Sequence, residues 1–192
     1  MPWLERDCSW PHYSWNIYEL CSHFAPYGGI TAMAIRIEAA YPRVNSLSLS
    51  NHWGNQLQCQ ASYLRNALFN QGYLDEQFLQ LEELQDEANP NFVEEVVKLF
   101  YTDSARLIRN IELTLENTPW DFEKLDNIMH QYQGSSSSIG AKKVKKECTQ
   151  FQEYCKVENI DGCVRTFKEV KQEHATLKRK LENYFQLARE AR

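Results

Sequence analysis

The chain has 192 residues, a formal net charge of −5 and a hydrophobic content of 43%. This length favours one domain with an appendage, and the apolar fraction is sufficient for a packed core. The negative charge argues against a general nucleic-acid binder. No run approaches the roughly 18 consecutive apolar residues that a membrane span needs. The first residues also lack the basic-then-apolar order of a secretion signal. We therefore expect neither nucleic acid nor membrane as a partner.

Cysteine and histidine spacing excludes the common covalent and metal frameworks. The six cysteines form no CxxC pair. Cys148 and Cys155 fall on one helical face and are predicted to be small buried apolar residues in a reducing compartment. Four metal-capable side chains lie near the N-terminus, but their spacing matches no tight zinc pattern, so no metal site is expected. These four are Cys8, His12, Cys21 and His23.

Residues 1–55 differ in composition from the rest of the chain. They hold four of the five tryptophans and only three basic residues. They show no sustained helical or strand period, and the Ser-Leu-Ser-Leu-Ser-Asn run at 46–51 indicates turn-rich chain. We predict an irregular or disordered extension of unknown role over residues 1–55 and a helical-bundle domain over residues 56–192.

From Leu57 onward, apolar residues recur at helical spacing. Gly72, Pro90 and Pro119 fall where the first three stripes end, and Asp121 is predicted to be the N-cap of the fourth helix. Short connections between long amphipathic helices predict an all-α fold, an antiparallel four-helix bundle with additional N-terminal helices. Six helices are expected in all, with apolar stripes over residues 57–68, 74–81, 92–115, 122–136, 144–155 and 163–188.

His130 lies in the fourth of these helices and points roughly 150° away from the centre of its apolar face. Gly134 follows one turn later on the same side. A glycine inside a helix costs about 1 kcal/mol relative to alanine, so its presence beside an exposed histidine suggests room for something to approach the ring. His174 instead falls within the apolar stripe of the last helix and is predicted to be a packed residue.

An isolated surface histidine has few chemical uses. His130 has no Ser or Cys nucleophile to serve and no second histidine to complete a helical metal pair. What remains is nucleophilic chemistry of the ring itself, because neutral imidazole accepts phosphoryl groups near neutral pH. The alternative is a solvated histidine with no role, which is the common state of surface histidines.

The residues around His130 resemble the signature of the plant histidine-containing phosphotransfer proteins. That family carries His-Gln-x-Lys-Gly-Ser-Ser-x-Ser, and this chain has His-Gln-Tyr-Gln-Gly-Ser-Ser-Ser-Ser over residues 130–138. Further similar segments occur in the same order at 71–78, 84–92 and 162–163. The resemblance spans roughly residues 57–188 and leaves residues 1–55 outside it.

The resemblance implies a phosphoryl carrier of a cytokinin-type two-component phosphorelay. His130 would accept a phosphoryl group from the receiver aspartate of a hybrid histidine kinase and pass it to the receiver aspartate of a response regulator. The implied partners are these receiver domains, which would contribute Mg²⁺, so the chain is expected to have no cofactor of its own. No ATP-binding motif is present, so an intrinsic kinase is not expected. At this size we expect both cytoplasmic and nuclear localisation.

Seven further residues are predicted to support His130 or to contact the receiver. Ser137 lies near the face of His130 and is the best candidate hydrogen-bond donor, whereas Ser136 falls on the core side. The basic cluster at 142–146 opposes the dipole of its own helix, which suggests a use such as meeting an acidic receiver surface; the alternative is a solvated face. The seven supporting residues are Gln131, Gln133, Gly134, Ser135, Ser137, Lys143 and Lys145.

One departure from the family signature leaves a second function open. Gln133 stands where the family has Lys, and an uncharged amide should stabilise a phosphoryl group less than an ammonium. Family members without the histidine are taken as pseudo-transmitters that bind partners and block signalling. Because this chain keeps His130, an active shuttle is favoured. The alternatives are a receiver-binding module that transfers little phosphate and an unrelated structural bundle.

Overall fold

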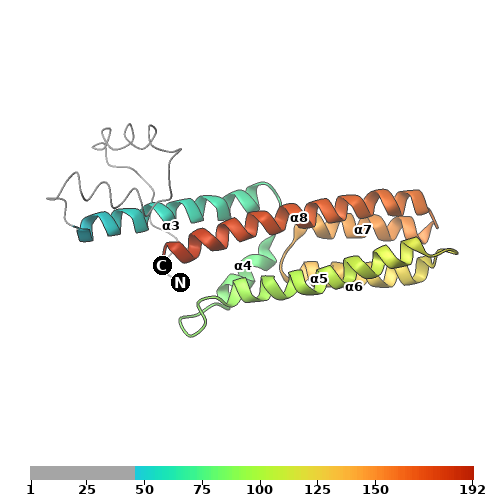
Figure 1. Cartoon of the computed structure of the whole chain (residues 1–192), viewed down its shortest axis with the longest axis horizontal. Helices are drawn as coiled ribbons and strands as arrows, with labels where there is room; N and C mark the ends of the chain where they lie inside the picture. The colour runs from blue at the N-terminus through green and yellow to red at the C-terminus, as the bar shows by residue number, and fades with distance from the viewer. Residues whose placement is uncertain (1–45) are drawn as a thin grey trace.

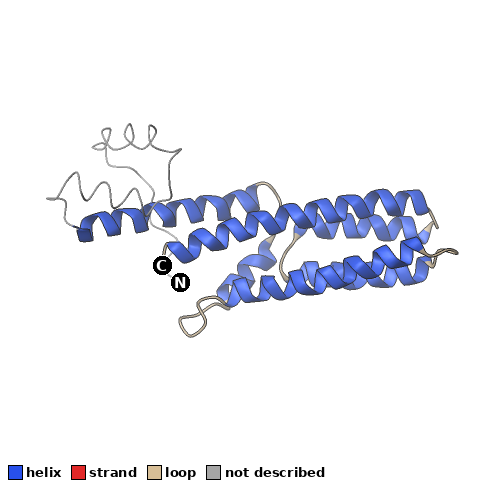
Figure 2. Cartoon of the chain, in the orientation of Figure 1, coloured by secondary structure: helices blue, strands red, loops and turns tan. Residues whose placement is uncertain are grey.

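The structure is a computed structural model that describes residues 46–192, so the predictions for residues 1–45 lie outside the described residues. Within this range the chain forms six helices and no strand, which confirms the all-α prediction (Figure 2). The helices are α3 (Ser46–Asn70), α4 (Glu76–Glu83), α5 (Phe92–Glu116), α6 (Phe122–Ser138), α7 (Lys142–Lys156) and α8 (Ile160–Glu190).

The antiparallel four-helix bundle consists of α5, α6, α7 and α8 (Figure 1). Helix α6 packs between α5 and α7, and α8 packs against α7. Because α8 is 31 residues long, it extends beyond the bundle, and α3 lies antiparallel along this extension. Gln58 ties the two helices together through a hydrogen bond from its Nε2 to the carbonyl oxygen of Ala191, 3.3 Å away. The short helix α4 connects the α3–α8 pair to the bundle.

The domain boundary at residue 56 stays a prediction, but the irregular chain predicted up to residue 55 is wrong over residues 46–55. Helix α3 begins at Ser46, so residues 46–55 are helical rather than irregular. The alternating Ser and Leu residues carry no 3.6-residue period, which is why the sequence pattern indicated turns. Once the later part of α3 is packed on α8, however, each further helical residue adds a backbone hydrogen bond at little cost, because nucleation has already occurred.

The core is continuous along the bundle and includes the predicted buried thiols. Cys148 and Cys155 are buried as expected, and Cys163 is buried beside Cys155, with 3.6 Å between their sulfur atoms. Burial raises the pKa of the Cys148 thiol to about 12, so this group packs as a small neutral side chain. The largest fully buried side chains include Phe78, Leu107, Ile111, Leu125, Met129, Tyr132, Phe151, Leu177 and Leu181.

His174 is half-buried and lies among aromatic rings, in agreement with its place in the apolar stripe of α8. Its ring centroid lies 5.2 Å from that of Tyr101, 5.9 Å from that of Phe100 and 6.1 Å from that of Tyr132. Its Nε2 is buried and has no hydrogen-bond partner within residues 46–192. Burial, with a smaller contribution from the nearby charge of Lys178, lowers the pKa of His174 to about 4. The ring is therefore neutral at physiological pH.

This burial predicts a pH-dependent stability term. Unfolding returns His174 to an ordinary pKa of about 6.5, so between that pH and about 4 the unfolded chain binds the proton more strongly than the folded chain. Stability from this residue is therefore complete above pH 6.5 and falls as the pH drops through this window. Urea unfolding gives the fall in the free energy of unfolding from pH 7 to pH 4.5. This fall should be about 2 kcal/mol smaller in His174→Phe than in the parent chain. Protonation of carboxylates in this pH range affects both proteins and cancels in the comparison. An equal loss of unfolding free energy in both would contradict the lowered pKa of His174.

Candidate functional site

Helix α6 fixes the direction of His130 through its buried face. The helix begins where predicted, because the Asp121 carboxylate accepts a hydrogen bond from the backbone N–H of Lys124 at 2.8 Å and so caps the first turn. Five side chains of the opposite face are buried, and His130 itself is exposed. The buried residues are Leu125, Ile128, Met129, Tyr132 and Ser136. Because α6 cannot turn about its axis without exposing this face, the imidazole stays in the solvent.

Gly134 lies one turn beyond His130 and leaves the backbone uncovered. The residue is exposed, and a Cβ built on it would meet no atom within 4 Å. No packing contact inside the chain therefore requires a glycine at this position. What the glycine provides is space on the solvent side, next to the imidazole.

Gln133 bridges the seam between α6 and α7. Its side chain is half-buried, and its Nε2 donates a hydrogen bond to Oγ1 of Thr149 on α7 over 2.7 Å. Thr149 was not among the residues singled out from the sequence. Its position on the polar face of α7 gives no signal of a contact with α6, since the register between two helices is set by their packing. Gln131, on the other side of His130, is exposed.

The serine run after Gly134 is hydrogen-bonded to its own helix. Ser136 is buried on the core side, as expected, and its hydroxyl donates to the Tyr132 carbonyl over 2.8 Å. Ser137 donates to the Gln133 carbonyl over 2.8 Å. Ser138 donates to the carbonyl of Ser135 over 2.7 Å, and Ser135 is half-buried. A donor role for Ser137 toward a phosphoryl group stays a prediction, and it would require this internal bond to break.

The two lysines predicted to meet a receiver both have partners within the chain. Nζ of Lys143 lies 3.9 Å from the ring centroid of Tyr73. Nζ of Lys145 forms an ion pair of 3.0 Å with Oδ2 of Asp75, the residue that caps α4. Both contacts join α7 to the α3–α4 connection. A role of Lys143 and Lys145 in receiver binding stays a prediction, whereas Lys146 is 82% exposed at the side chain.

A glycine corner sets where α7 begins relative to α6. Gly140 has a φ of +68°, and its carbonyl accepts a hydrogen bond of 3.0 Å from the N–H of Asp75. A Cβ at Gly140 would lie 2.6 Å from a carboxylate oxygen of Asp75 and 2.7 Å from the backbone nitrogen of Phe78. This corner therefore requires a glycine, both for its backbone conformation and for the close approach of α4.

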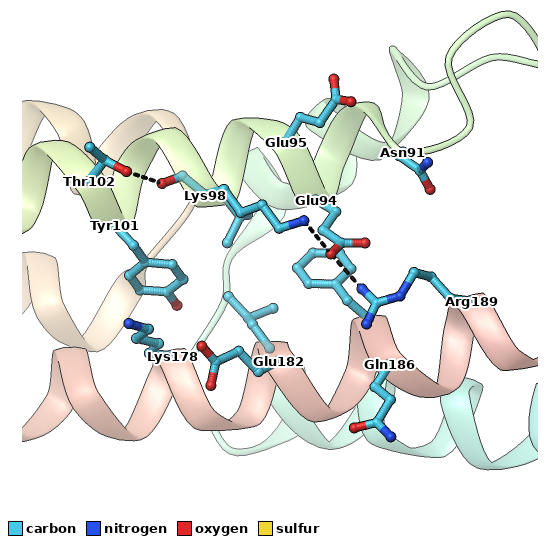
Figure 3. A pocket seen from close by; sticks show the side chains of 13 residues that line it. Asn91, Glu94, Glu95, Lys98, Tyr101, Thr102, Lys178, Glu182, Gln186 and Arg189 are labelled. Carbon is cyan, nitrogen blue, oxygen red and sulfur yellow. Dashed lines mark hydrogen bonds and ion pairs between the residues drawn. The ribbon is translucent and has the colours of Figure 1, made fainter.

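A groove of about 690 Å³ lies elsewhere, between the first half of α5 and the second half of α8 (Figure 3). In this groove the Glu94 carboxylate pairs with both Lys98 and Arg189. None of the predicted site residues lines it. The groove is thus separate from the surface around His130.

Two further observations limit the chemistry of the described part. Across residues 46–192, no three His, Cys, Asp or Glu side chains are grouped so as to hold a metal ion. None of the helices in this range is long and apolar enough to cross a membrane.

Among the described residues, the bundle presents an exposed histidine beside an uncovered glycine, as a phosphotransfer domain would. The comparisons with known proteins identify the same class. The family model for the Hpt domain matches residues 95–180, which include His130 and most of the four-helix bundle. The chain belongs to the plant histidine-containing phosphotransfer protein family. It is 65% identical to "Histidine-containing phosphotransfer protein 4" of Arabidopsis thaliana over 116 aligned residues. The aligned region covers 60% of this chain and 91% of that protein.

The chain is similar both to histidine-containing phosphotransfer proteins and to pseudo histidine-containing phosphotransfer proteins. The chain is 57% identical to "Pseudo histidine-containing phosphotransfer protein 5" of Oryza sativa subsp. japonica, over 72% of this chain and 91% of that protein. Among solved structures, the histidine-containing phosphotransfer protein MtHPt2 of Medicago truncatula matches with a TM-score of 0.67 and 42% identity, over 70% of this chain and 91% of that one. These matches show the fold and the family of the chain.

The two glycines of this region should respond oppositely to alanine. Gly134→Ala should raise the free energy of unfolding by about 0.5–1 kcal/mol, because the new methyl group meets nothing and the unfolded chain loses freedom. Gly140→Ala should lower it by more than that, because of its positive φ and its two close contacts. Urea denaturation measures both. A destabilising Gly134→Ala would show that this glycine has a packing role and is not there to leave space.

Proposed function

We propose that this chain is a phosphoryl carrier in which His130 accepts the group from a receiver aspartate and passes it to another receiver. The observation that carries the proposal is the exposed ring of His130 next to the uncovered backbone of Gly134, on a helix held by its buried face. A flat receiver surface can approach such a ring without displacing any side chain of the chain itself. The similarity to histidine-containing phosphotransfer proteins of Arabidopsis thaliana and Medicago truncatula supports the same activity.

The transfer needs little from the chain beyond position. The lone pair of Nε2 attacks the phosphorus of the aspartyl phosphate, the N–P bond forms, and the O–P bond breaks with its electrons returning to the carboxylate. The proton on Nδ1 stays on the ring until solvent removes it. Receiver Mg²⁺ and a receiver lysine neutralise the charge on the moving group, so that positioning is the main contribution of the carrier. We propose no cofactor bound by the chain itself.

The relay setting follows from the family and goes beyond the geometry. We place the donor aspartate in the receiver domain of a hybrid histidine kinase and the acceptor aspartate in a response regulator, in a cytokinin-type pathway. We also propose that the carrier is present in both the cytoplasm and the nucleus. Phosphate would reach the chain only from a receiver, with no use of ATP by the chain.

A direct transfer assay tests the proposal. A receiver domain phosphorylated with radioactive phosphate, mixed with the chain and Mg²⁺, should leave acid-labile, base-stable label on the chain. His130→Gln should abolish this label. His174→Phe, which removes the other histidine among the described side chains, should retain it. Label that persists in His130→Gln would sink the proposal.

The second candidate is a receiver-binding module that transfers little phosphate. Two observations favour it: Gln133 replaces the family lysine beside His130, and several relatives carry the name pseudo. In the same assay, this candidate predicts a complex with the receiver but no label on the chain.

Replacing the amide of Gln133 by an ammonium should strengthen the phosphorylated state. An ammonium at this position can donate a charge-assisted hydrogen bond to the phosphoryl oxygens, so Gln133→Lys should lengthen the life of phospho-His130 roughly two- to tenfold. The decay of label after removal of the receiver measures this lifetime. Gln131→Lys adds the same charge on an exposed neighbouring position and should have a smaller effect. If neither the transfer rate nor the lifetime changes in Gln133→Lys, the residue plays no part in holding the phosphoryl group.

A further inference from the structure

Thr149 determines how the Gln133 amide is oriented. A threonine hydroxyl carries one proton, and Oγ1 of Thr149 donates it to the carbonyl oxygen of Lys145 over 3.1 Å. The same oxygen can therefore only accept from Gln133, so the nitrogen of the amide faces α7, with 2.7 Å between Nε2 and Oγ1. One of the two N–H donors of Gln133 is thus occupied inside the chain.

The bridge is held from both helices. Thr149 sits on a turn of α7 that begins at Lys145, and Lys145 is itself anchored by its ion pair with the α4 cap Asp75. On the other side, Gln133 follows His130 by one turn of α6 and is half-buried along the α6–α7 seam. The hydrogen bond to Thr149 therefore holds the Gln133 amide against α7.

Building on the proposed function, we propose that Thr149 is a positioning residue that withholds the Gln133 amide from the phosphoryl group on His130. With the hydroxyl present, the amide is bonded across the seam and contributes little to the phosphorylated state. Without it, the amide can rotate toward the phosphoryl oxygens and donate to them. The hydroxyl therefore weakens retention of phosphate by the carrier and favours onward transfer to a receiver.

The equilibrium of the phosphoryl group between His130 and a receiver aspartate tests this directly. The chain and a receiver domain carrying radioactive phosphate are mixed in fixed amounts. The ratio of labelled chain to labelled receiver is then measured at equilibrium. Thr149→Val removes the hydroxyl at nearly constant shape and should raise this ratio roughly two- to tenfold, the effect of one added hydrogen bond. Thr149→Ser keeps the hydroxyl and should match the parent chain.

Two controls separate positioning from a general structural effect. Thr102 on α5 is also exposed and donates to the carbonyl four residues earlier, over 3.0 Å. It lines the groove between α5 and α8, so Thr102→Val makes the same chemical change away from the α6–α7 seam and should leave the ratio unchanged. In a Gln133→Ala background, Thr149→Val should have no further effect.

The outcomes are distinct. A ratio unchanged by Thr149→Val, or a rise that persists with Gln133→Ala, overturns the positioning role while the carrier function stands. A parent chain that takes no label at all removes the proposed function and this inference with it.

Discussion

Burial of one face of α6 is the constraint on which the site depends. Leu125, Met129 and Tyr132 are fully buried, and burying such side chains is worth roughly 1.5–3 kcal/mol each. Rotating the helix to bring His130 inward would expose them, so the direction of the imidazole is fixed by the hydrophobic core. His174 shows the opposite case, because it faces the core and lies among three aromatic rings, where it is neutral. His130 and His174 therefore differ in chemistry because one lies on the solvent-facing side of its helix and the other on the core-facing side.

The surroundings of His130 are set by the corner between α6 and α7. Gly140 turns the chain, Asp75 anchors both Gly140 and Lys145, and the resulting register places Thr149 beside Gln133. The hydroxyl of Ser137 and the side chains of Lys143 and Lys145 have partners inside the chain. The ring of His130 and the backbone at Gly134 are open to solvent. The geometry therefore favours a carrier that offers a nucleophile and space and leaves charge neutralisation to its partner.

The sequence predicted the six helices, the bundle and the exposed position of His130, because helical periodicity directly reports which face is buried. The start of α3 at Ser46 was missed, since the Ser-Leu alternation has no helical period and the helix is extended from a packed segment. The bridge from Gln133 to Thr149 and the ion pair from Lys145 to Asp75 could not be found either. Both depend on the register between helices, which is a property of packing and not of local pattern.

The central claim is that His130 alone among the histidines of the bundle is placed to carry phosphate. Nitrogen-resolved NMR of the imidazole rings, recorded while a phosphorylated receiver loses its phosphate in the presence of the chain, tests it most directly. The account predicts that the Nε2 resonance of His130 shifts as the N–P bond forms, while the ring of His174 is unchanged. A receiver that is dephosphorylated with no change at His130, or a shift at His174 instead, would contradict it.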